Sequence, residues 1–338
     1  MRAPSFWWRE AGATAGLLAP AAAIYGAVAA ARLRQPGARA GVPVLCVGNP
    51  TLGGSGKTPT ALALARLLIA AGERPWLLSR GYGGQLAGPV TVDPRHHRAD
   101  DVGDEPLLLA RCAPTIIARD RVAGARTARA GGASVIVMDD GFQNPALAKD
   151  LAILVADGRR GVGNGLGFPA GPLRAPLAAQ FARAHAILLI GEGSAAVPIA
   201  AAAEAHGLAL FRGRLVPDAD ALAALAGRRV LAFAGIGDPD KFFATLAEVG
   251  IEAAVRRSFP DHHPYTASDA AGLIAEADRA GLSLVTTEKD LVRLRGKRAL
   301  ADLAARTRAL PVTLAIEEED HFRRFVLAAI AAAKTPAA

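Results

Sequence analysis

The stretch that decides the fold reads Val47-Gly48-Asn49-Pro50-Thr51-Leu52-Gly53-Gly54-Ser55-Gly56-Lys57-Thr58. It joins a short apolar run, Val42–Val47, to a helical pattern over Thr58–Ala71. Glycines let the backbone turn so tightly that successive N–H groups and the start of the next helix face phosphate oxygens. A strand, a glycine-rich loop ending in Gly-Lys-Thr and a helix together predict a nucleoside triphosphate site.

Individual residues of this loop have predicted tasks. Lys57 is expected to reach the β- and γ-phosphates, and Thr58 to offer its hydroxyl to Mg²⁺. The strict phosphate-loop pattern has glycine five residues before Gly56, where this chain has Thr51. The residues predicted to bind the nucleotide are Thr51, Gly53, Gly54, Ser55, Gly56, Lys57 and Thr58.

Beyond the loop, short apolar runs alternate with helical patterns. Most of the runs lack strict alternation, as expected of parallel strands covered on both faces. The predicted strands are 42–47, 75–78, 114–118, 134–138, 151–155 and 184–190. This order predicts an α/β fold of the P-loop NTPase type, with a doubly wound, mostly parallel sheet over residues 36–215. A smaller α/β unit over 216–338, closing a cleft, is predicted from strands near 229–234, 284–286 and 311–315.

Composition narrows the function classes. The 338 residues are enough for about two domains. A net charge of +8 implies acidic partners, which are nucleic acid, anionic lipid or a phosphorylated substrate. Aromatic residues make up only 5%, too few for a base-stacking surface, and no nucleic-acid motif is present, so we predict no nucleic-acid partner. Two cysteines exclude a disulfide framework and suit a reducing compartment.

Residues 1–35 are predicted to form an apolar helix that associates with a membrane. The segment from Ala11 to Ala31 has no charge, and its length just suffices to span a bilayer, but it is rich in Ala and Gly and contains Pro20. Trp7 and Trp8 precede it as candidate interfacial anchors. An interfacial helix is the favoured interpretation, and a spanning helix, a buried helix or a signal peptide are the alternatives.

Three acidic or histidine-containing segments are candidates for chemistry. Asp139 and Asp140 end an apolar strand, where a P-loop protein commonly places an Mg²⁺ ligand. Asp104 and Glu105 form a second acidic pair, for which a solvated loop is an equal alternative. Phe259–Tyr265 contains two adjacent histidines, which cannot easily bind one metal ion, so a role in proton transfer is the functional alternative to simple exposure.

These segments together resemble the tetraacyldisaccharide 4'-kinase family of lipid A biosynthesis. The matching stretches follow one another over about 240 residues and include the unusual Thr51 loop; they are Val47–Pro59, Ser79–Gly83, Val102–Pro106, Asp139–Gln143, Gly163–Gly165, Pro169–Arg174, Phe259–His262 and Thr286–Asp290. The chain departs from the family at Asn144, where histidine is usual, and at Lys149, where arginine is common.

The resemblance implies an ATP-dependent kinase, which transfers the γ-phosphoryl group to the 4'-hydroxyl of a tetraacylated glucosamine disaccharide 1-phosphate. It implies Asp104 as general base with His262 as its partner, and Lys57 as a catalytic cation. Thr58, Glu105, Asp139 and Asp140 would organise Mg²⁺. Residues expected at the substrate are Arg80, Tyr82, Arg119, Arg121, Gln143, Asn164 and Arg174, since guanidinium groups match phosphate oxygens.

The implied location is the cytoplasmic face of a bacterial inner membrane, with the protein held peripherally on an anionic surface as a monomer. A regulatory GTPase or metallochaperone is the main rival. Its guanine-reading motif needs one residue between Lys and Asp, whereas Lys289 and Asp290 are adjacent, and ligand clusters of Cys or His are lacking. A DNA-binding ATPase is the second rival, which the basic charge alone suggests.

Overall fold

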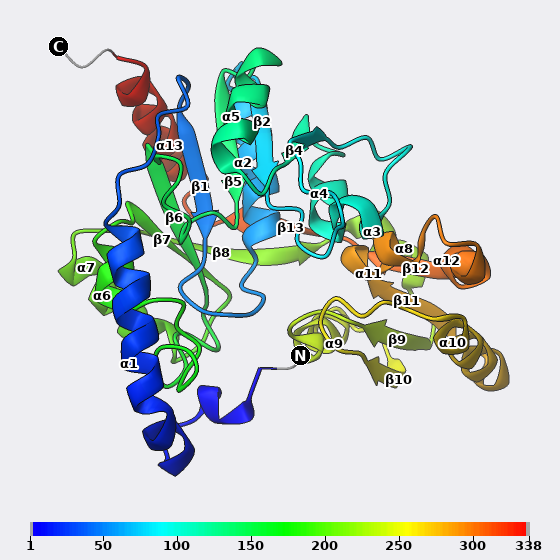
Figure 1. The fold of residues 1–338 in the computed structure, drawn as a ribbon. Coiled ribbons are helices and arrows are strands. Elements are labelled where there is room, and N and C mark those ends of the chain that lie inside the picture. Colours follow the sequence, from blue (N-terminus) through cyan, green and yellow to red (C-terminus); the bar gives the residue numbers. More distant parts are fainter. Residues whose placement is uncertain (1–2, 336–338) are drawn as a thin grey trace.

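The computed structural model describes residues 3–335 and contains two sheets (Figure 1). The larger one has nine strands in the order β13-β8-β7-β6-β1-β5-β2-β4-β3. Its inner pairs are parallel, and only the edge pairs β13–β8 and β3–β4 are antiparallel. The strands are β1 (Val44–Gly48), β2 (Pro75–Ser79), β3 (Val90–Thr91), β4 (Thr115–Ile117), β5 (Val135–Asp139), β6 (Leu151–Asp157), β7 (Ala186–Ile190), β8 (Ala209–Pro217) and β13 (Val312–Ile316).

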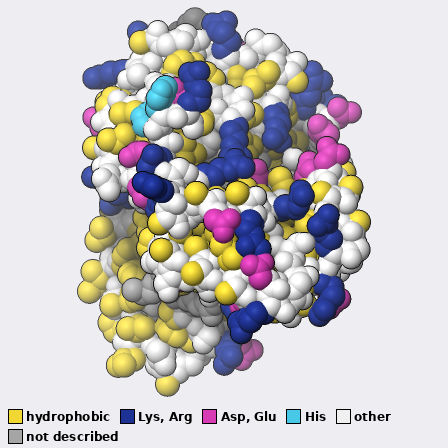
Figure 2. All heavy atoms as spheres, turned by 90° about the vertical axis from the view of Figure 1, so that its right-hand side faces the viewer, with side chains coloured by type: hydrophobic (Ala, Val, Ile, Leu, Met, Phe, Trp, Pro, Cys, Tyr) yellow, Lys and Arg dark blue, Asp and Glu magenta, His cyan; other side chains and the backbone are white. Residues whose placement is uncertain are grey.

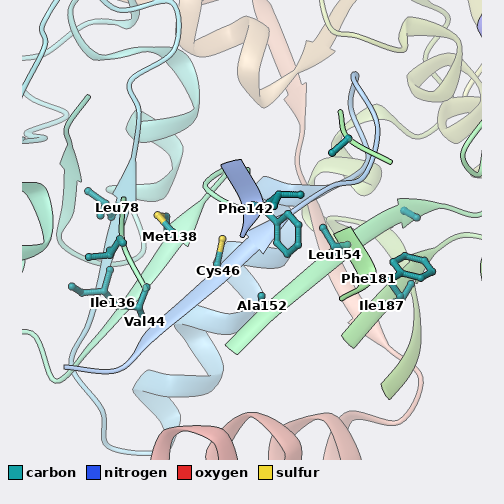
Figure 3. Close-up of a cluster of buried hydrophobic side chains, with 14 of the residues drawn as sticks. Val44, Cys46, Leu78, Ile136, Met138, Phe142, Ala152, Leu154, Phe181 and Ile187 are labelled. Carbon is teal, nitrogen blue, oxygen red and sulfur yellow. The ribbon is translucent and has the colours of Figure 1, made fainter. Parts of the chain in front are cut away.

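Helices cover both faces of this sheet, which confirms the predicted doubly wound α/β fold. Neighbouring residues of a strand point to opposite faces, so Val44 and Cys46 join one core cluster and Leu45 and Val47 join the other. Figure 3 shows the first cluster, in which Phe142 and Phe181 pack beside β1 and β6. The helices of this unit are α1 (Ala13–Leu33), α2 (Lys57–Ala70), α3 (Ala99–Val102), α4 (Asp104–Leu109), α5 (Arg121–Ala130), α6 (Leu177–Phe181), α7 (Ala196–Ala205) and α13 (Glu319–Lys334).

The smaller unit is a four-stranded parallel sheet in the order β10-β9-β11-β12. Its central strand β9 is buried on both faces, against α8 and α9 on one side and α10, α11 and α12 on the other. The elements are β9 (Val230–Ala234), β10 (Ala253–Ser258), β11 (Ser283–Thr287), β12 (Thr307–Leu310), α8 (Ala219–Leu225), α9 (Pro239–Glu248), α10 (Ala267–Ala280), α11 (Glu288–Leu294) and α12 (Ala301–Arg306).

One strand does not lie where the sequence predicts it. The run 311–315 was assigned to the smaller unit, but β13 pairs antiparallel with β8 at the edge of the larger sheet. Only Pro311 separates it from β12, so the chain crosses between the two sheets at that residue. Helix α13 follows β13 and packs on the larger sheet through Phe322, Val326 and Ile330. The predicted range 216–338 therefore includes a strand and a helix of the larger unit.

This return of the chain makes the last helix part of the larger core. Phe322 is 1% exposed and packs edge-to-face on Phe211 of β8, with 4.9 Å between ring centroids. We predict that Phe322→Ala lowers the free energy of unfolding by about 3–5 kcal/mol, because it removes an aromatic ring from a packed core. Arg324→Ala on the exposed face of α13 is the control, and urea denaturation of both variants is the measurement. A loss below about 1 kcal/mol for Phe322→Ala would contradict this packing.

Candidate active site

The glycine-rich loop lies at the carboxyl end of β1, the edge of a parallel sheet where ligands bind. Its last glycine, Gly56, has φ +96°, which side chains other than glycine rarely adopt, and directly precedes α2. A Cβ atom on Gly56 would lie 2.6 Å from Cδ1 of Ile190. The free backbone N–H groups at the start of α2 therefore lie next to the loop, where a triphosphate site needs hydrogen-bond donors.

Side chains from distant segments hold the loop in shape. Nδ2 of Asn49 donates to the carbonyl oxygens of Thr51 and Gly53 over 2.6 and 3.1 Å. Arg174 donates from Nε to Thr51 O over 3.0 Å, and Gln143 from Nε2 to Asn49 O over 3.0 Å. Thr51 also forms a β-bridge with Leu173, an extended conformation that does not need the glycine of the strict pattern.

Lys57, Asp140 and Arg174 form a charged cluster beside the loop. Nζ of Lys57 lies 3.7 Å from Oδ2 of Asp140, and Nη1 of Arg174 donates to Asp140 Oδ1 over 3.0 Å. Burial lowers the pKa of Lys57, against the opposing effect of Asp140. Burial alone raises the pKa of Asp140, but the Lys57 and Arg174 charges outweigh it and the pKa lies below its usual range. Asp140 thus stays ionised between two cations.

Asp139 is in the opposite situation. It is 1% exposed at the end of β5, and neither carboxylate oxygen has a hydrogen-bond partner. Burial, together with the charges of Glu105 and Asp140, raises the pKa of Asp139 to about 7. An orphaned buried carboxylate in this place fits a site for a hard cation such as Mg²⁺. Within residues 3–335 no three His, Cys, Asp or Glu side chains lie close enough to hold a metal ion by themselves, so hydroxyl, water or phosphate oxygens would complete the set.

The predicted pair of Asp104 and His262 is brought together from the two units. Nδ1 of His262 lies 3.4 Å from Oδ2 of Asp104. Burial alone raises the pKa of Asp104, but the His262 hydrogen bond and the Arg293 charge outweigh it and the pKa falls well below its usual range. Burial lowers the pKa of His262, but Asp104 reverses this and the pKa lies above the usual value. His262 has φ +55°, rare for a non-glycine residue and frequent at functional sites.

One cavity of about 860 Å³ joins these groups. Lys57, Thr58 and Asp140 line it from the larger unit, and His262 and Lys289 line it from the smaller one. Asp104 is 3% exposed and lies behind His262, which presents the pair to the cavity. The ring of Tyr82 packs edge-to-face against that of His262, with 5.0 Å between centroids. A phosphate loop and a candidate base thus face the same space.

Most predicted substrate residues line this cavity. Arg80 and Arg119 are exposed at it, and neither forms an ion pair with another described residue. Arg121 is buried, donates to Ala118 O and leaves its Nε without a partner. The cavity-lining residues of the predicted set are Arg80, Tyr82, Arg119, Arg121, Gln143 and Arg174.

Asn164 is the exception. Its side chain donates to Ala170 O over 2.9 Å and accepts from Leu166 N over 3.1 Å, so it orders the loop after β6 and does not line the cavity. The two departures from the resembled family contact each other, since Nζ of Lys149 donates to Asn144 O over 2.7 Å. Asn144 itself lies on the cavity wall.

The apolar helix α1 reaches the same cavity. It is one helix of 21 residues, long and apolar enough to span a membrane by length and composition, and it continues through Pro20. Leu17, Ile24 and Val28 form an exposed stripe along it, and Tyr25, Val28, Ala29 and Arg32 line the cavity. In Figure 1 the helix runs along the outside of the larger unit.

The predicted tryptophan anchors are placed differently. Trp7 is 6% exposed, and its Nε1 donates to Pro169 O over 3.0 Å while its ring packs on Phe168. The ring of Trp8 lies under the guanidinium of Arg160. Trp7 is therefore wrong as a membrane anchor, because its indole is buried and fixes the start of the chain to the loop before Arg174.

Sequence reasoning missed two cations of the site. Nζ of Lys289 pairs with Oε1 of Glu105, and Arg293 pairs with Asp104. Lys289 lies within the matching stretch Thr286–Asp290, and Arg293 lies outside every matching stretch. The available signal was the spacing of Asp290 and Arg293, three residues apart on the short helix after β11, where opposite charges meet.

Comparisons with known proteins agree with this geometry. The family of tetraacyldisaccharide-1-P 4'-kinases matches residues 14–331. A tetraacyldisaccharide 4'-kinase of Rhodopseudomonas palustris (strain BisB18) is 59% identical over 327 residues, 97% of this chain and 95% of the relative. One from Methylobacterium sp. (strain 4-46) is 60% identical over 321 residues, 95% of each. The crystal structure of LpxK from Aquifex aeolicus in complex with ATP has a TM-score of 0.71 at 26% identity and covers 94% of this chain and 99% of that one.

The conformation of Gly56 yields a prediction. Gly56→Ala should weaken binding of a nucleoside triphosphate about tenfold or more, because the added Cβ strains the backbone and meets Ile190 within the loop. Gly72→Ala is the matched control: its φ is +81°, it follows α2, and a Cβ there meets nothing within 4 Å. Titration calorimetry with ATP measures both. Equal affinity of the two variants would show that Gly56 does not shape the site.

Proposed function

The chain belongs to the tetraacyldisaccharide-1-P 4'-kinase family, and from this premise we propose which residues carry the reaction. It is an ATP-dependent kinase that transfers the γ-phosphoryl group to the 4'-hydroxyl of tetraacyldisaccharide 1-phosphate, giving the 4'-phosphorylated lipid A precursor in lipopolysaccharide biosynthesis. The observation that carries the assignment of residues is the shared cavity, which Lys57 lines from the larger unit and His262 from the smaller one.

The donor side of the cavity is proposed to be the phosphate loop. Residues Thr51, Gly53, Gly54, Ser55 and Gly56 present backbone groups to the triphosphate, and Lys57 neutralises charge on the β- and γ-phosphates. Phosphoryl transfer depends chiefly on in-line positioning and on charge neutralisation, and the buried Lys57 supplies the second. Arg174 both holds Thr51 and pairs with Asp140, so it positions the loop.

Mg²⁺ is proposed to bind next to this loop. The unpartnered carboxylate of Asp139 is the best-suited ligand, and Thr58 and Asp140 lie on the same side of the cavity. Glu105 is paired with Lys289, and Asp140 with Lys57 and Arg174, so these two predicted ligands already have cationic partners. When bound, the ion would neutralise charge on the phosphate oxygens.

The acceptor side is proposed to be the Asp104–His262 pair acting together as general base. Burial and Arg293 hold Asp104 in place, and His262 shares its Oδ2. The pair accepts the hydroxyl proton while the imidazole is neutral, and the ion pair with Asp104 stabilises the imidazolium that results. Arg80, Arg119 and Arg121, with Tyr82, are proposed to bind the phosphate and sugar of the substrate, because all four line the cavity and guanidinium groups match phosphate oxygens.

Helix α1 is proposed to place this cavity at the lipid surface. A substrate with four acyl chains stays in the bilayer, and the exposed stripe of α1 continues into the cavity wall at Val28. Arg9, Arg32 and Arg34 add attraction to anionic lipid of about 1 kcal/mol each near the surface; Arg2, also expected there, lies outside the described residues. Because ATP is cytosolic, we place the enzyme on the cytoplasmic face of the inner membrane, held peripherally.

One chain supplies the phosphate loop, the base pair and the cavity, so we propose that the enzyme works as a monomer. In Figure 2 the Lys and Arg side chains are spread over the face, with Asp and Glu among them. This differs from the continuous basic stripe that nucleic-acid binding uses, and the proposed partners are the lipid substrate and the anionic membrane.

The base pair is tested by a double-mutant cycle. Asp104→Ala and His262→Ala should each lower kcat about 10²- to 10⁴-fold with little change in the KM for ATP, and the double variant should lose less than the product of the two. His263→Ala is the control, because His263 pairs with Asp269 away from the cavity. Initial rates with γ-labelled ATP and the disaccharide lipid give these values. Fully multiplicative losses would show that the two residues act independently.

The pH dependence follows from the same pair. Since Asp104 raises the pKa of His262, the neutral imidazole is lost as the pH falls through a value above the usual one. We predict that kcat of the wild type declines on that acidic side, and that the decline is absent from the pH profile of His262→Ala. An unchanged acidic limb in the variant would assign the titration to another group.

The membrane role of α1 is tested by introducing negatively charged residues into its exposed stripe. Leu17 and Ile24 are 82% and 70% exposed, so the double variant Leu17→Glu/Ile24→Glu should fold and should bind vesicles at least about tenfold more weakly. Ile69→Glu on α2 is the control at an exposed apolar residue elsewhere. Co-sedimentation with phosphatidylglycerol-containing vesicles measures both. Undiminished binding of the double variant would rule out this stripe as the contact.

A further inference from the structure

Arg293 is buried between the smaller unit and the proposed base. It lies on α11 and is 6% exposed. Its Nε donates to Oδ2 of Asp104 over 2.7 Å, and Nη2 lies 2.5 Å from the same oxygen. Its Nη1 donates to Gly235 O over 2.6 Å and to Asp290 Oδ1 over 2.9 Å. One guanidinium group therefore joins α4 of the larger unit to two segments of the smaller unit.

The far end of this guanidinium is fixed by Asp290. The Asp290 carboxylate is fully buried and accepts from Gly235 N over 3.0 Å, from Tyr265 OH over 2.9 Å and from Thr287 Oγ1 over 2.6 Å. Because Gly235 N, Tyr265 OH and Arg293 Nη1 all converge on Oδ1 while Thr287 holds Oδ2, the buried Asp290 carboxylate keeps the arginine in one orientation. Among the described residues, Asp104 is the one residue of the larger unit with which the guanidinium forms a hydrogen bond or ion pair.

Asp104 depends on this contact for its position. Its Oδ1 accepts the neighbouring Glu105 N–H over 2.9 Å, and its Oδ2 is shared by Arg293 and His262. His262 N in turn donates to Gly235 O over 3.0 Å, the same carbonyl that Arg293 contacts. Arg293 and His262 therefore share two contacts: both bond to the carbonyl oxygen of Gly235, and both lie against Oδ2 of Asp104.

We propose that Arg293 is a positioning residue for phosphoryl transfer: its planar fork sets the Asp104 carboxylate against His262, and it does so only while the smaller unit is docked on α4. The proposal rests on the Asp104–His262 pair being the general base. Arg293 does not line the cavity, and Asp104 is the one member of the proposed catalytic machinery with which it forms a hydrogen bond or ion pair among the described residues, so its effect passes through Asp104. A lysine cannot replace it, because one ammonium group cannot reach Asp104, Asp290 and Gly235 in the geometry of the fork.

The test compares Arg293→Lys with wild type in the full-length enzyme, using γ-labelled ATP and the disaccharide lipid. We expect kcat to fall about 10- to 100-fold, because a misplaced catalytic group loses alignment, while the KM for ATP stays within about twofold. Arg257→Lys is the matched control, since Arg257 pairs with Glu276 on the outer surface of the same unit. Its kcat should not change. A folded Arg293→Lys enzyme with kcat within about twofold of wild type overturns the proposal.

A second comparison separates positioning from general stability. In an Asp104→Asn background, Arg293→Lys should cause no further loss in kcat, because the group that it positions is already disabled. The same fold-loss in both backgrounds overturns the proposal. If Arg293→Lys does not fold, the same cycle is run with Tyr265→Phe, which keeps the ring and removes only the hydrogen bond to Asp290. A smaller loss of kcat, again absent in the Asp104→Asn background, supports the proposal, and none overturns it.

Failure of the base assignment has a different signature. Wild-type activity of Asp104→Asn contradicts the role of Asp104 itself, and any loss caused by Arg293→Lys in that case also overturns action through Asp104. A large loss in Asp104→Asn combined with full activity of Arg293→Lys leaves the base in place and removes only the inference about Arg293.

Discussion

The active site depends on bringing four carboxylates together beside a triphosphate loop, two of them buried and two partly exposed. Isolated buried charges are costly, so each needs a partner of opposite charge. Asp104 has Arg293, Glu105 has Lys289, and Asp140 has Lys57 and Arg174. Asp139 has no such partner, and burial together with the charges of Glu105 and Asp140 raises its pKa to about 7. The pattern of pairing therefore separates three carboxylates that have cationic partners within the protein from Asp139, which fits the proposed cation site.

The same requirement ties the two units together. Lys289 and Arg293 both lie on α11 of the smaller unit, and their carboxylate partners begin α4 of the larger one. Lys241 of α9 and Asp157 of β6 form a further pair across the units, with 2.7 Å between Nζ and Oδ2. The chain itself crosses twice, at the end of β8 and at Pro311, where Asp218 N donates to Pro311 O. Charge pairing and two crossing strands thus hold the cavity in shape.

Helix α1 contributes to the cavity wall over its second half. It is fixed at its start by Trp7 in the loop that also carries Arg174, and at its end by Leu33 in the core. Between these points its apolar stripe is exposed, and Val28 belongs both to this stripe and to the cavity wall. The proposed meeting of a lipid substrate with the nucleotide rests on this continuity.

The sequence by itself determined the elements whose signals are local. The phosphate loop, the buried strands β1, β5, β6 and β7, and the start of α2 follow from glycine, apolar runs and the Gly-Lys-Thr ending, because these depend on near neighbours in the chain. The matching motifs identified the family and selected Asp104, His262 and Lys57, which the structure brings to one cavity or directly behind its wall.

Only the tertiary structure decided which of these groups are paired and which face the cavity. Nothing near Arg293 in the chain shows that it lies against Asp104, 189 residues away, or that Asp104 is behind His262. The chemistry of Trp7 suits a membrane anchor and that of Asn164 suits a substrate contact. In the structure, however, both side chains donate hydrogen bonds to the same loop, to Pro169 O and Ala170 O. Whether β13 joins the larger or the smaller sheet depends on which sheet has an unpaired edge strand beside it. That is a property of the assembled sheets, and no local sequence pattern shows it.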